Sequence, residues 1–209
     1  SRQVGHASAA FSEAPAGFDS QSNGMLEPAD FEEARDTFEE QEDPDEGLGP
    51  LFNARSCGEC HATPVTGGSS QVTELRAGHF DGSAFNDHPG GSLINDRSIN
   101  AFISETIMPG NEVRTFRLST STLGLGFVEA VDDATLQDIA RNQPAQSAGR
   151  INGTALNVPI LETRNGRRVG RFGWKCQHGS LVSFAADAYL NEMGITTPLQ
   201  PTENTSNGN

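Results

Sequence analysis

Apolar side chains recur at helical spacing in three segments, and this pattern predicts three amphipathic helices. The first covers residues 28–42 and carries acidic residues on its other face. The second begins at Asp132 or Asp133, and the third is capped by Ser180 and ends at Gly194. The faces expected to be buried are Phe31, Ala34 and Phe38; Leu136, Ile139 and Ala140; and Leu181, Phe184, Ala185 and Ala188.

Strand signals are weaker than helix signals. An Asn-Gly pair between residues 158–162 and 168–172 predicts a short β-hairpin, and residues 72–75 alternate as a strand does. Residues 78–91 are rich in Gly, Asp, Asn and His, which favours a loop. Residues 96–107 are expected to form a short helix that ends before a Met-Pro-Gly sequence. The expected fold class is therefore mainly α, with long loops and one short hairpin.

The composition changes this picture in one respect. Only 34% of the 209 residues are hydrophobic, whereas the chain contains 23 Gly and 11 Pro. Such a mixture is typical of a loop-rich domain that buries something besides its own side chains. General disorder is the alternative, but apolar and aromatic segments recur from Leu51 to Ile195, which argues against it.

The net charge of −14 argues against a nucleic-acid partner, because phosphates would be repelled. Many of the acidic residues lie between Glu32 and Glu46. Such a run is usually a solvated face; a docking surface that steers a basic protein partner and a weak calcium site are the alternatives. No stretch of the sequence approaches the length of a transmembrane helix, so we expect a chain that does not span a membrane.

The sequence Cys57-Gly58-Glu59-Cys60-His61 is the attachment signature of haem c. Two thiols three positions apart on a tight helical turn can each add to one vinyl group of the same porphyrin. The histidine that follows is then carried beneath the iron and supplies an imidazole ligand. The motif predicts one covalently bound haem, whose apolar plate would supply core that the composition lacks.

Three other interpretations of the two cysteines remain open. A thioredoxin-like redox pair requires a βαβ context, which the pattern does not show. Zinc could be held by Cys57, Cys60, Cys176 and His178, in a zinc-stabilised interaction module. A structural disulfide between Cys57 and Cys60 is the third interpretation.

The surroundings of the motif resemble the bacterial di-haem c-type oxidoreductase family, whose members are labelled thiol oxidoreductases or peroxidases. Residues 47–54, which read GLGPLFNA and lead into the motif, carry the start of the resemblance. Three further blocks follow in the family's order, and together they cover most of residues 14–199. These blocks are LGLGFVEA at 123–130, GRFGWK at 170–175 and LNEMGIT at 190–196.

The resemblance implies a cytochrome c-like haem domain at residues 28–197, preceded by an extended segment at 1–27 and followed by a polar tail at 198–209. Members of the family usually continue into a second cytochrome c domain, whereas this chain has a single CxxCH. The expected function is single-electron transfer between redox partners. The enzymatic alternative is the electron-relay half of a di-haem peroxidase or thiol oxidoreductase. Because bacteria attach haem c outside the cytoplasm, the expected location is periplasmic or exported.

An electron-transfer haem usually has a second strong axial ligand, whereas a peroxidase haem keeps one position open. The leading candidate is Met193, which ends an apolar helix directly before Gly194; core packing is the alternative role. Met108 precedes a proline, as the distal ligand region of many small cytochromes c does. The remaining candidates are the histidines His79, His88 and His178.

Other residues are expected to surround the haem. Phe52, Trp174 and Phe172 are candidates for the pocket wall. Arginines suit the haem propionates because a planar guanidinium matches a carboxylate. The candidates for this role are Arg97, Arg114, Arg117 and Arg171. Cys176 is expected to be a free, buried thiol.

Overall fold

The computed structural model describes residues 18–22, 24 and 26–208, so most of the predicted N-terminal segment 1–27 lies outside the described residues. Helices make up 31% of the chain and strands 19%, with several small antiparallel sheets. The fold is therefore mixed α/β, and the expectation of a mainly α fold was wrong. None of the described helices is long and apolar enough to cross a bilayer.

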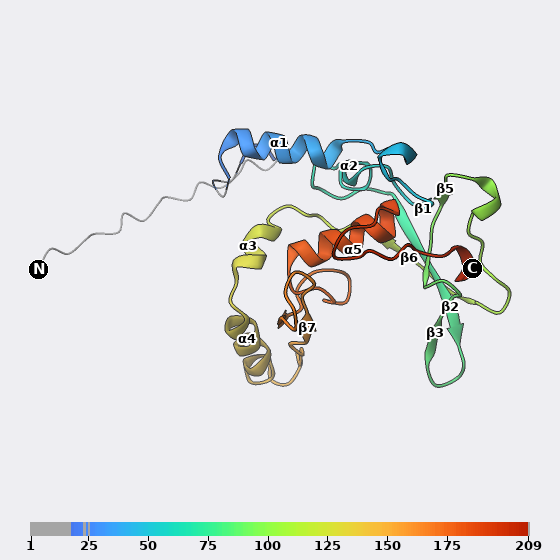
Figure 1. Ribbon diagram of the computed structural model, residues 1–209. Coiled ribbons are helices and arrows are strands. Elements are labelled where there is room, and N and C mark those ends of the chain that lie inside the picture. The colour runs from blue at the N-terminus through green and yellow to red at the C-terminus, as the bar shows by residue number, and fades with distance from the viewer. Residues whose placement is uncertain (1–17, 23, 25, 209) are drawn as a thin grey trace, which may run out of the picture.

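Five α-helices occur in the described part of the chain (Figure 1). Helix α1 begins at Pro28 and ends at Glu39, and just beyond it the amide of Glu42 donates to Arg55 O. Helix α2 at the motif is a single turn, comprising only Cys57–Cys60. The others are α3 (Leu125–Ala130), α4 (Asp133–Gln146) and α5 (Leu181–Met193).

The largest sheet is antiparallel and is built on β2 (Thr73–Phe80). Strand β6 (Val113–Leu118) pairs along one edge of β2, from Thr73 opposite Leu118 to Gly78 opposite Val113. The other edge pairs with β3 (Phe85–Asp87) and β4 (Leu93–Ile94). Two smaller ladders join β1 (Leu51–Phe52) to β5 (Arg97–Ser98) and β7 (Asn157–Pro159) to β8 (Arg167–Val169).

The predicted loop at 78–91 was wrong in part, because its first and middle residues belong to β2 and β3. The residues between β2 and β3 form the turn of a hairpin, in which Asp81 accepts hydrogen bonds from the amides of Ser83 and Ala84. The predicted helix at 96–107 is also absent, since that segment contains β5 and a single 3-10 turn at Ala101–Ile103. The predicted hairpin at the Asn-Gly pair is confirmed as β7–β8.

Tertiary hydrogen bonds explain why residues 96–107 are not helical. The amide of Asp96 donates to Asn53 Oδ1, and the amide of Asn95 donates to Glu105 Oε2. These bonds hold the segment extended against β1 and α5, so the local helical preference is overridden.

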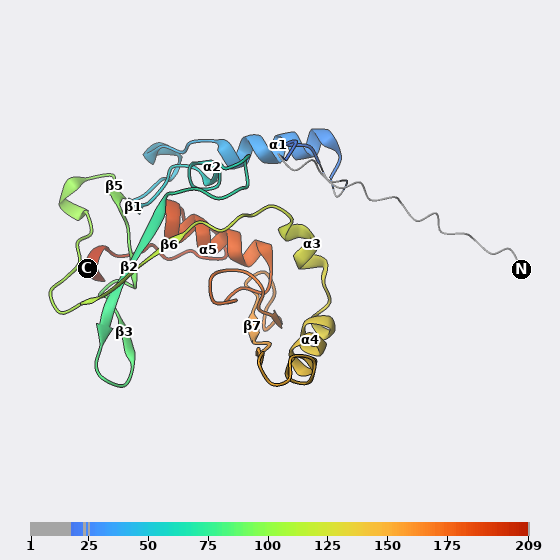
Figure 2. The same cartoon turned by 180° about the vertical axis from the view of Figure 1, so that it is seen from behind.

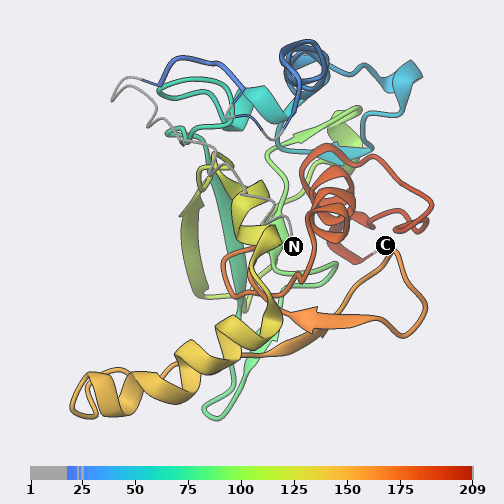
Figure 3. The ribbon, with the colours of Figure 1, turned by 90° about the vertical axis from the view of Figure 1, so that its left-hand side faces the viewer.

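Helices α4 and α5 begin where the sequence predicted, but their buried faces differ from the prediction. Helix α4 projects from the rest of the molecule and has no buried residue; Ile139 is 49% exposed (Figure 3). Helix α5 lies centrally, between α2 and the β7–β8 hairpin (Figures 1 and 2). Its side chains buried in protein are Ser183, Ala186, Leu190 and Met193, not the predicted set.

The small core lies where α5 ends beside β1. Met193 is 4% exposed and packs with Leu48 and Phe52. Gly194 caps the helix in a left-handed conformation (φ 66°), and a Cβ there would lie 2.4 Å from Leu51 O. Residues after Pro198 return to this body: Asn204 Nδ2 donates to Leu190 O and Ser206 Oγ donates to Ile103 O.

Candidate functional site

A cavity of about 470 Å³ lies beside α5 and contains the side chains of the CxxCH motif in its wall. Helices α1 and α2 close one side, and the strands β2 and β6 close another (Figure 1). Helix α3 and the loop at residues 173–177 complete the wall. Its volume lies within the range of about 300–1,000 Å³ usual for cofactor and small-molecule pockets.

The motif forms one helical turn because of its neighbours. Ser56 is the N-cap of α2, and its Oγ accepts a hydrogen bond from the amide of Glu59 at 3.1 Å. The Glu59 carboxylate in turn accepts from the amide of Arg55 at 2.7 Å. Because Cys57 and Cys60 are three positions apart on this turn, both thiols lie on one face. Both cysteines line the cavity and neither is disulfide-linked.

A close approach between α1 and α2 explains why glycine occupies the position directly after Cys57 in the motif. A Cβ on Gly58 would lie 3.3 Å from Glu39 Cα and 3.5 Å from Phe38 O. Glycine at this position therefore lets α2 pack directly against the end of α1.

His61 follows the turn, and its imidazole also lines the cavity. Its Nδ1 lies 3.1 Å from Gly68 O. Since a carbonyl oxygen can only accept, Nδ1 carries a proton, and in the neutral imidazole Nε2 keeps its lone pair. Phe38 packs against the ring, with 6.0 Å between the ring centroids. This arrangement fixes the tautomer and orientation that a metal-ligating imidazole requires.

Burial raises the pKa of both thiols. The pKa of Cys57 is above its usual value, and that of Cys60 is raised to about 11 by burial and by the nearby carboxylates of Glu192 and Glu59. Both groups therefore stay protonated near neutral pH. Thioredoxin-like pairs depend on a thiol pKa that is lowered, so this site differs from them in the direction of the shift.

The predicted apolar face of α5 lines the cavity, which is why it is not buried in protein. Leu181, Phe184, Ala185 and Ala188 all belong to the cavity wall. The other large apolar groups of the wall are Phe38, Val72, Leu118, Leu125, Trp174, Tyr189 and Met193. Trp174 was predicted to lie here, and its Nε1 donates to Leu118 O at 3.2 Å. The apolar spacing in α5 thus predicted the apolar face correctly, but this face borders the cavity instead of packing against other protein side chains.

Met193 is the one predicted second ligand that lines the same cavity as His61. His79 instead lies on the surface, with Nδ1 2.8 Å from the Glu112 carboxylate. His88 is buried, and both ring nitrogens are used: Nδ1 lies 2.8 Å from Pro89 O, and Nε2 accepts from the amide of Met108 at 2.9 Å. Neither histidine is placed to act as a ligand beside the motif.

The two remaining candidates are also outside the described cavity wall. Met108 is 40% exposed. His178 has Nε2 3.2 Å from Asp187 Oδ2, and its ring packs against Phe184. The four residues of the zinc hypothesis are not assembled: among the described residues no group of three His, Cys, Asp or Glu side chains could hold a metal ion. Cys176 is exposed, which contradicts the buried thiol that we expected.

Several predicted pocket residues have other roles. Phe52 belongs to the core beside Met193, and Phe172 stacks on Phe184 within the protein. Arg97 forms an ion pair with Glu59, with 2.7 Å between Nη2 and Oε1. Arg171 is almost fully buried and donates to Val131 O and to the Asp133 carboxylate.

Of the predicted arginines, Arg117 lines the cavity, together with Arg76 from the neighbouring strand. The carboxylate of Glu74 bridges them, 2.7 Å from Arg76 Nη2 and 3.6 Å from Arg117 Nη1. Arg76 and Glu74 were not predicted. No motif marks them, because only the pairing of β2 with β6 brings Glu74 opposite Arg117.

Glu192 is a second carboxyl group that the sequence did not single out. It lines the cavity, and its Oε2 accepts from Asn53 Nδ2 at 2.7 Å. Burial, with the nearby Glu74 carboxylate, raises its pKa to about 7. The protonated form is therefore favoured in the folded chain.

This raised pKa predicts a pH-dependent stability. From pH 4.5, the usual value, to about 7, the folded chain binds more protons at Glu192 than the unfolded chain does. The free energy of unfolding should thus fall as the pH rises through this window. Glu192→Gln, which mimics the protonated acid, should flatten the fall, while replacement of the exposed Glu33 by Gln should not. Urea unfolding between pH 4.5 and 8 measures this, and equal slopes for wild type and Glu192→Gln would contradict it.

No protein-family model matches the chain, and the comparisons with curated proteins and with solved structures likewise give no significant match.

Proposed function

We propose that this chain is a c-type cytochrome domain that carries one haem, attached through Cys57 and Cys60, and transfers single electrons. One observation supports this most strongly. Both thiols and the His61 imidazole line one apolar-walled cavity of about 470 Å³, and His61 keeps Nε2 free. A haem is an apolar plate with carboxylates on one edge, and the wall offers apolar side chains together with Arg76 and Arg117.

The residues of the chain would act as follows. Cys57 and Cys60 would each add S–H across one vinyl double bond, so that a C–S bond forms and the thiol hydrogen goes to the other vinyl carbon. His61 would supply Nε2 to the iron while Gly68 O holds its Nδ1 proton. Met193 is the proposed second ligand. When bound, the haem supplies a one-electron couple between ferrous and ferric iron.

The acidic helix α1 supports the choice of partner. Ala34, Thr37 and Phe38 line the cavity, while Glu32, Glu33 and Asp36 on the same helix are exposed. Negative charge therefore lies on the surface nearest to the motif. We propose a redox protein with a basic face as the partner, because opposite charges speed association.

Membership of the di-haem oxidoreductase family, a periplasmic or exported location and the enzymatic alternative remain proposals that rest on the resemblance of the sequence. The enzymatic alternative requires an open axial position. It would gain support if the ferric protein proved to be high-spin.

A pyridine haemochrome spectrum combined with intact mass tests the proposal. Protein expressed with a functioning haem-attachment system should contain one haem per chain, with both vinyl groups saturated. The haem should remain on the polypeptide in denaturant because thioether bonds are covalent. Recovery of a colourless polypeptide with the mass of the bare chain would refute the proposal.

A further inference from the structure

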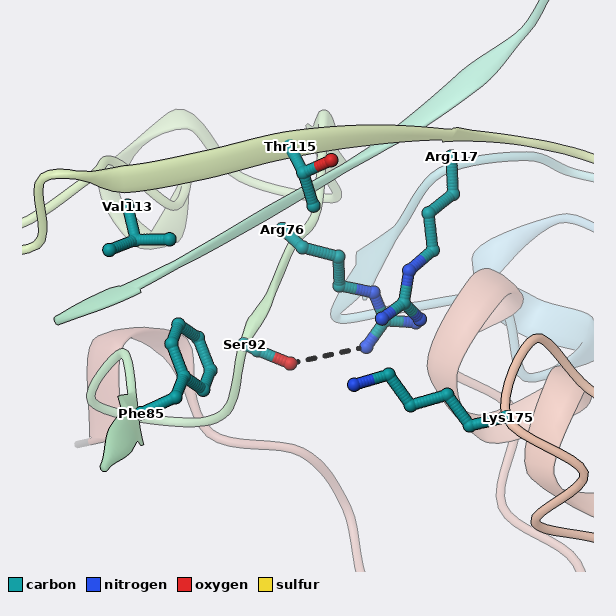
Figure 4. Close-up of a pocket in the computed structure, with 7 residues that line it drawn as sticks. All are labelled: Arg76, Phe85, Ser92, Val113, Thr115, Arg117 and Lys175. Carbon is teal, nitrogen blue, oxygen red and sulfur yellow. Dashed lines mark hydrogen bonds between the residues drawn. The ribbon is translucent and has the colours of Figure 1, made fainter. Parts of the chain in front are cut away.

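A second, smaller pocket of about 170 Å³ adjoins the cavity, on the face of the β2–β6 pair that carries Arg76 and Arg117. Ser92, which precedes β4, Thr115 of β6 and Lys175 from the loop after Trp174 complete its polar wall (Figure 4). Arg76 and Arg117 line both spaces. This pocket is far smaller than those that take drug-sized ligands.

The register of the strands brings the charged groups together. Glu74 lies opposite Arg117, and Arg76 lies opposite Thr115, so all four side chains share one face of the sheet. Figure 4 shows the guanidinium groups of Arg76 and Arg117 and the ammonium group of Lys175 converging near Ser92.

The pocket concentrates positive charge in a strongly acidic chain. The chain has 14 basic residues against 28 acidic ones, and Lys175 is its only lysine. Glu74 is the carboxylate that pairs with both arginines. Within the described part of the chain, the Lys175 ammonium forms no ion pair, and the buried Arg76 Nε has no hydrogen-bond partner. Glu192 lies beside Glu74 and Arg76, and its raised pKa of about 7 keeps much of it uncharged near neutral pH. Two arginines, which share the Glu74 carboxylate, and the Lys175 ammonium therefore leave a local excess of positive charge.

Neutral groups of the pocket suit an anion as well. Arg76 Nη1 lies 3.5 Å from Ser92 Oγ, which acts as acceptor and so keeps its own O–H for donation. The rest of the wall is formed by Thr115 and by the apolar side chains of Phe85 and Val113. Phe85 is 50% and Val113 37% exposed, so the pocket is open to water and the charge-assisted hydrogen bonds of its basic groups would carry the binding of an anion.

We propose that Arg76, Arg117, Lys175 and the Ser92 hydroxyl together bind one carboxylate or oxyanion group in this pocket. Two sources supply such a group. One is a propionate of the proposed haem, which would reach the arginines from the larger cavity and which rests on the proposed function. The other is a free anion of the size of phosphate, whose binding does not depend on the haem.

Isothermal titration calorimetry with inorganic phosphate, at constant ionic strength in chloride, tests the free anion on the purified full chain. Lys175→Gln should weaken phosphate binding roughly tenfold or more, the factor expected when one charge-assisted hydrogen bond is lost. Arg114→Gln is the matched control, because it removes the same charge from the other face of β6. Lys175 is exposed, so its replacement should leave the circular dichroism spectrum unchanged.

A second measurement tests whether a haem propionate is the group that binds in the pocket. If a propionate occupies the pocket, phosphate will not bind to the haem-loaded protein. The resonance Raman band of propionate bending, which responds to hydrogen bonding, should then shift in Lys175→Gln and not in Arg114→Gln. The proposal is overturned if phosphate does not bind and the propionate band is insensitive to Lys175, or if both variants weaken phosphate binding equally. If the chain carries no haem, the proposal stands or falls with the calorimetry: it requires phosphate binding that Lys175→Gln weakens more than Arg114→Gln does.

Discussion

Replacement of both Cys57 and Cys60 by serine is expected to abolish covalent haem attachment. A serine hydroxyl does not add to a vinyl group under the conditions in which a thiol does, so no bond to the polypeptide would form. Haem staining of the denatured chain should disappear, and the intact mass should fall to that of the apoprotein. Each single variant should keep one thioether and show one unsaturated vinyl group in its haemochrome spectrum.

Cys176→Ser is the matched control for this experiment. Cys176 is exposed and lies outside the described cavity wall, so its replacement should leave the haem content unchanged. A double variant that retains haem in denaturant would show that the two motif cysteines are not the points of attachment. An equal loss of haem in Cys176→Ser would contradict the assignment in a different way, by implicating a thiol remote from the motif.

The second large effect is expected at Met193. Met193→Leu conserves volume in the core beside Leu48 and Phe52, and should cost less than about 1.5 kcal/mol of stability. Met193→Ala would instead leave a space and cost about 2–5 kcal/mol, so leucine is the more informative substitution. If the Met193 sulfur is the second axial ligand, leucine removes it. The ferric spectrum should become high-spin, and the midpoint potential should fall by on the order of 0.1 V.

Met108→Leu is the control, since Met108 is 40% exposed and does not line the cavity. It should leave both the spectrum and the potential unchanged. An unchanged spectrum in Met193→Leu would restrict Met193 to core packing. The second axial position would then be open or filled from elsewhere, which favours the enzymatic alternative over the electron carrier.

Local features of the sequence predicted the helices better than the sheets. Helices α1, α4 and α5 were predicted because each has a cap or a proline at its start and a regular apolar spacing. Strand β6 was missed because its two arginines, Arg114 and Arg117, are three positions apart and fall on opposite faces, so that neither face is uniformly polar or apolar. Its stability comes from pairing with β2, a non-local interaction that single-segment patterns do not contain.

The contrast between local and non-local interactions also separates the parts of the site that were predicted from those that were not. Cys57, Cys60 and His61 are adjacent in sequence, so one helical turn is enough to place them together. Arg76 and Lys175 were not predicted, because they come from a strand and a loop that only the fold brings beside Arg117. Arg117 was predicted together with Arg97, which pairs with Glu59 instead, because an isolated arginine carries no sign of its partner.

The sequence by itself determined the chemistry of the motif turn and the position of the helix that faces it, because both depend on spacings within a few residues. Only the tertiary structure decided what that helix faces, which of the candidate ligands share a cavity with His61, and which arginines lie beside it. Those outcomes depend on strand register and on hydrogen bonds such as Asn53 to Glu192, which join residues 139 positions apart. The free energy of such contacts arises only when the whole chain is folded.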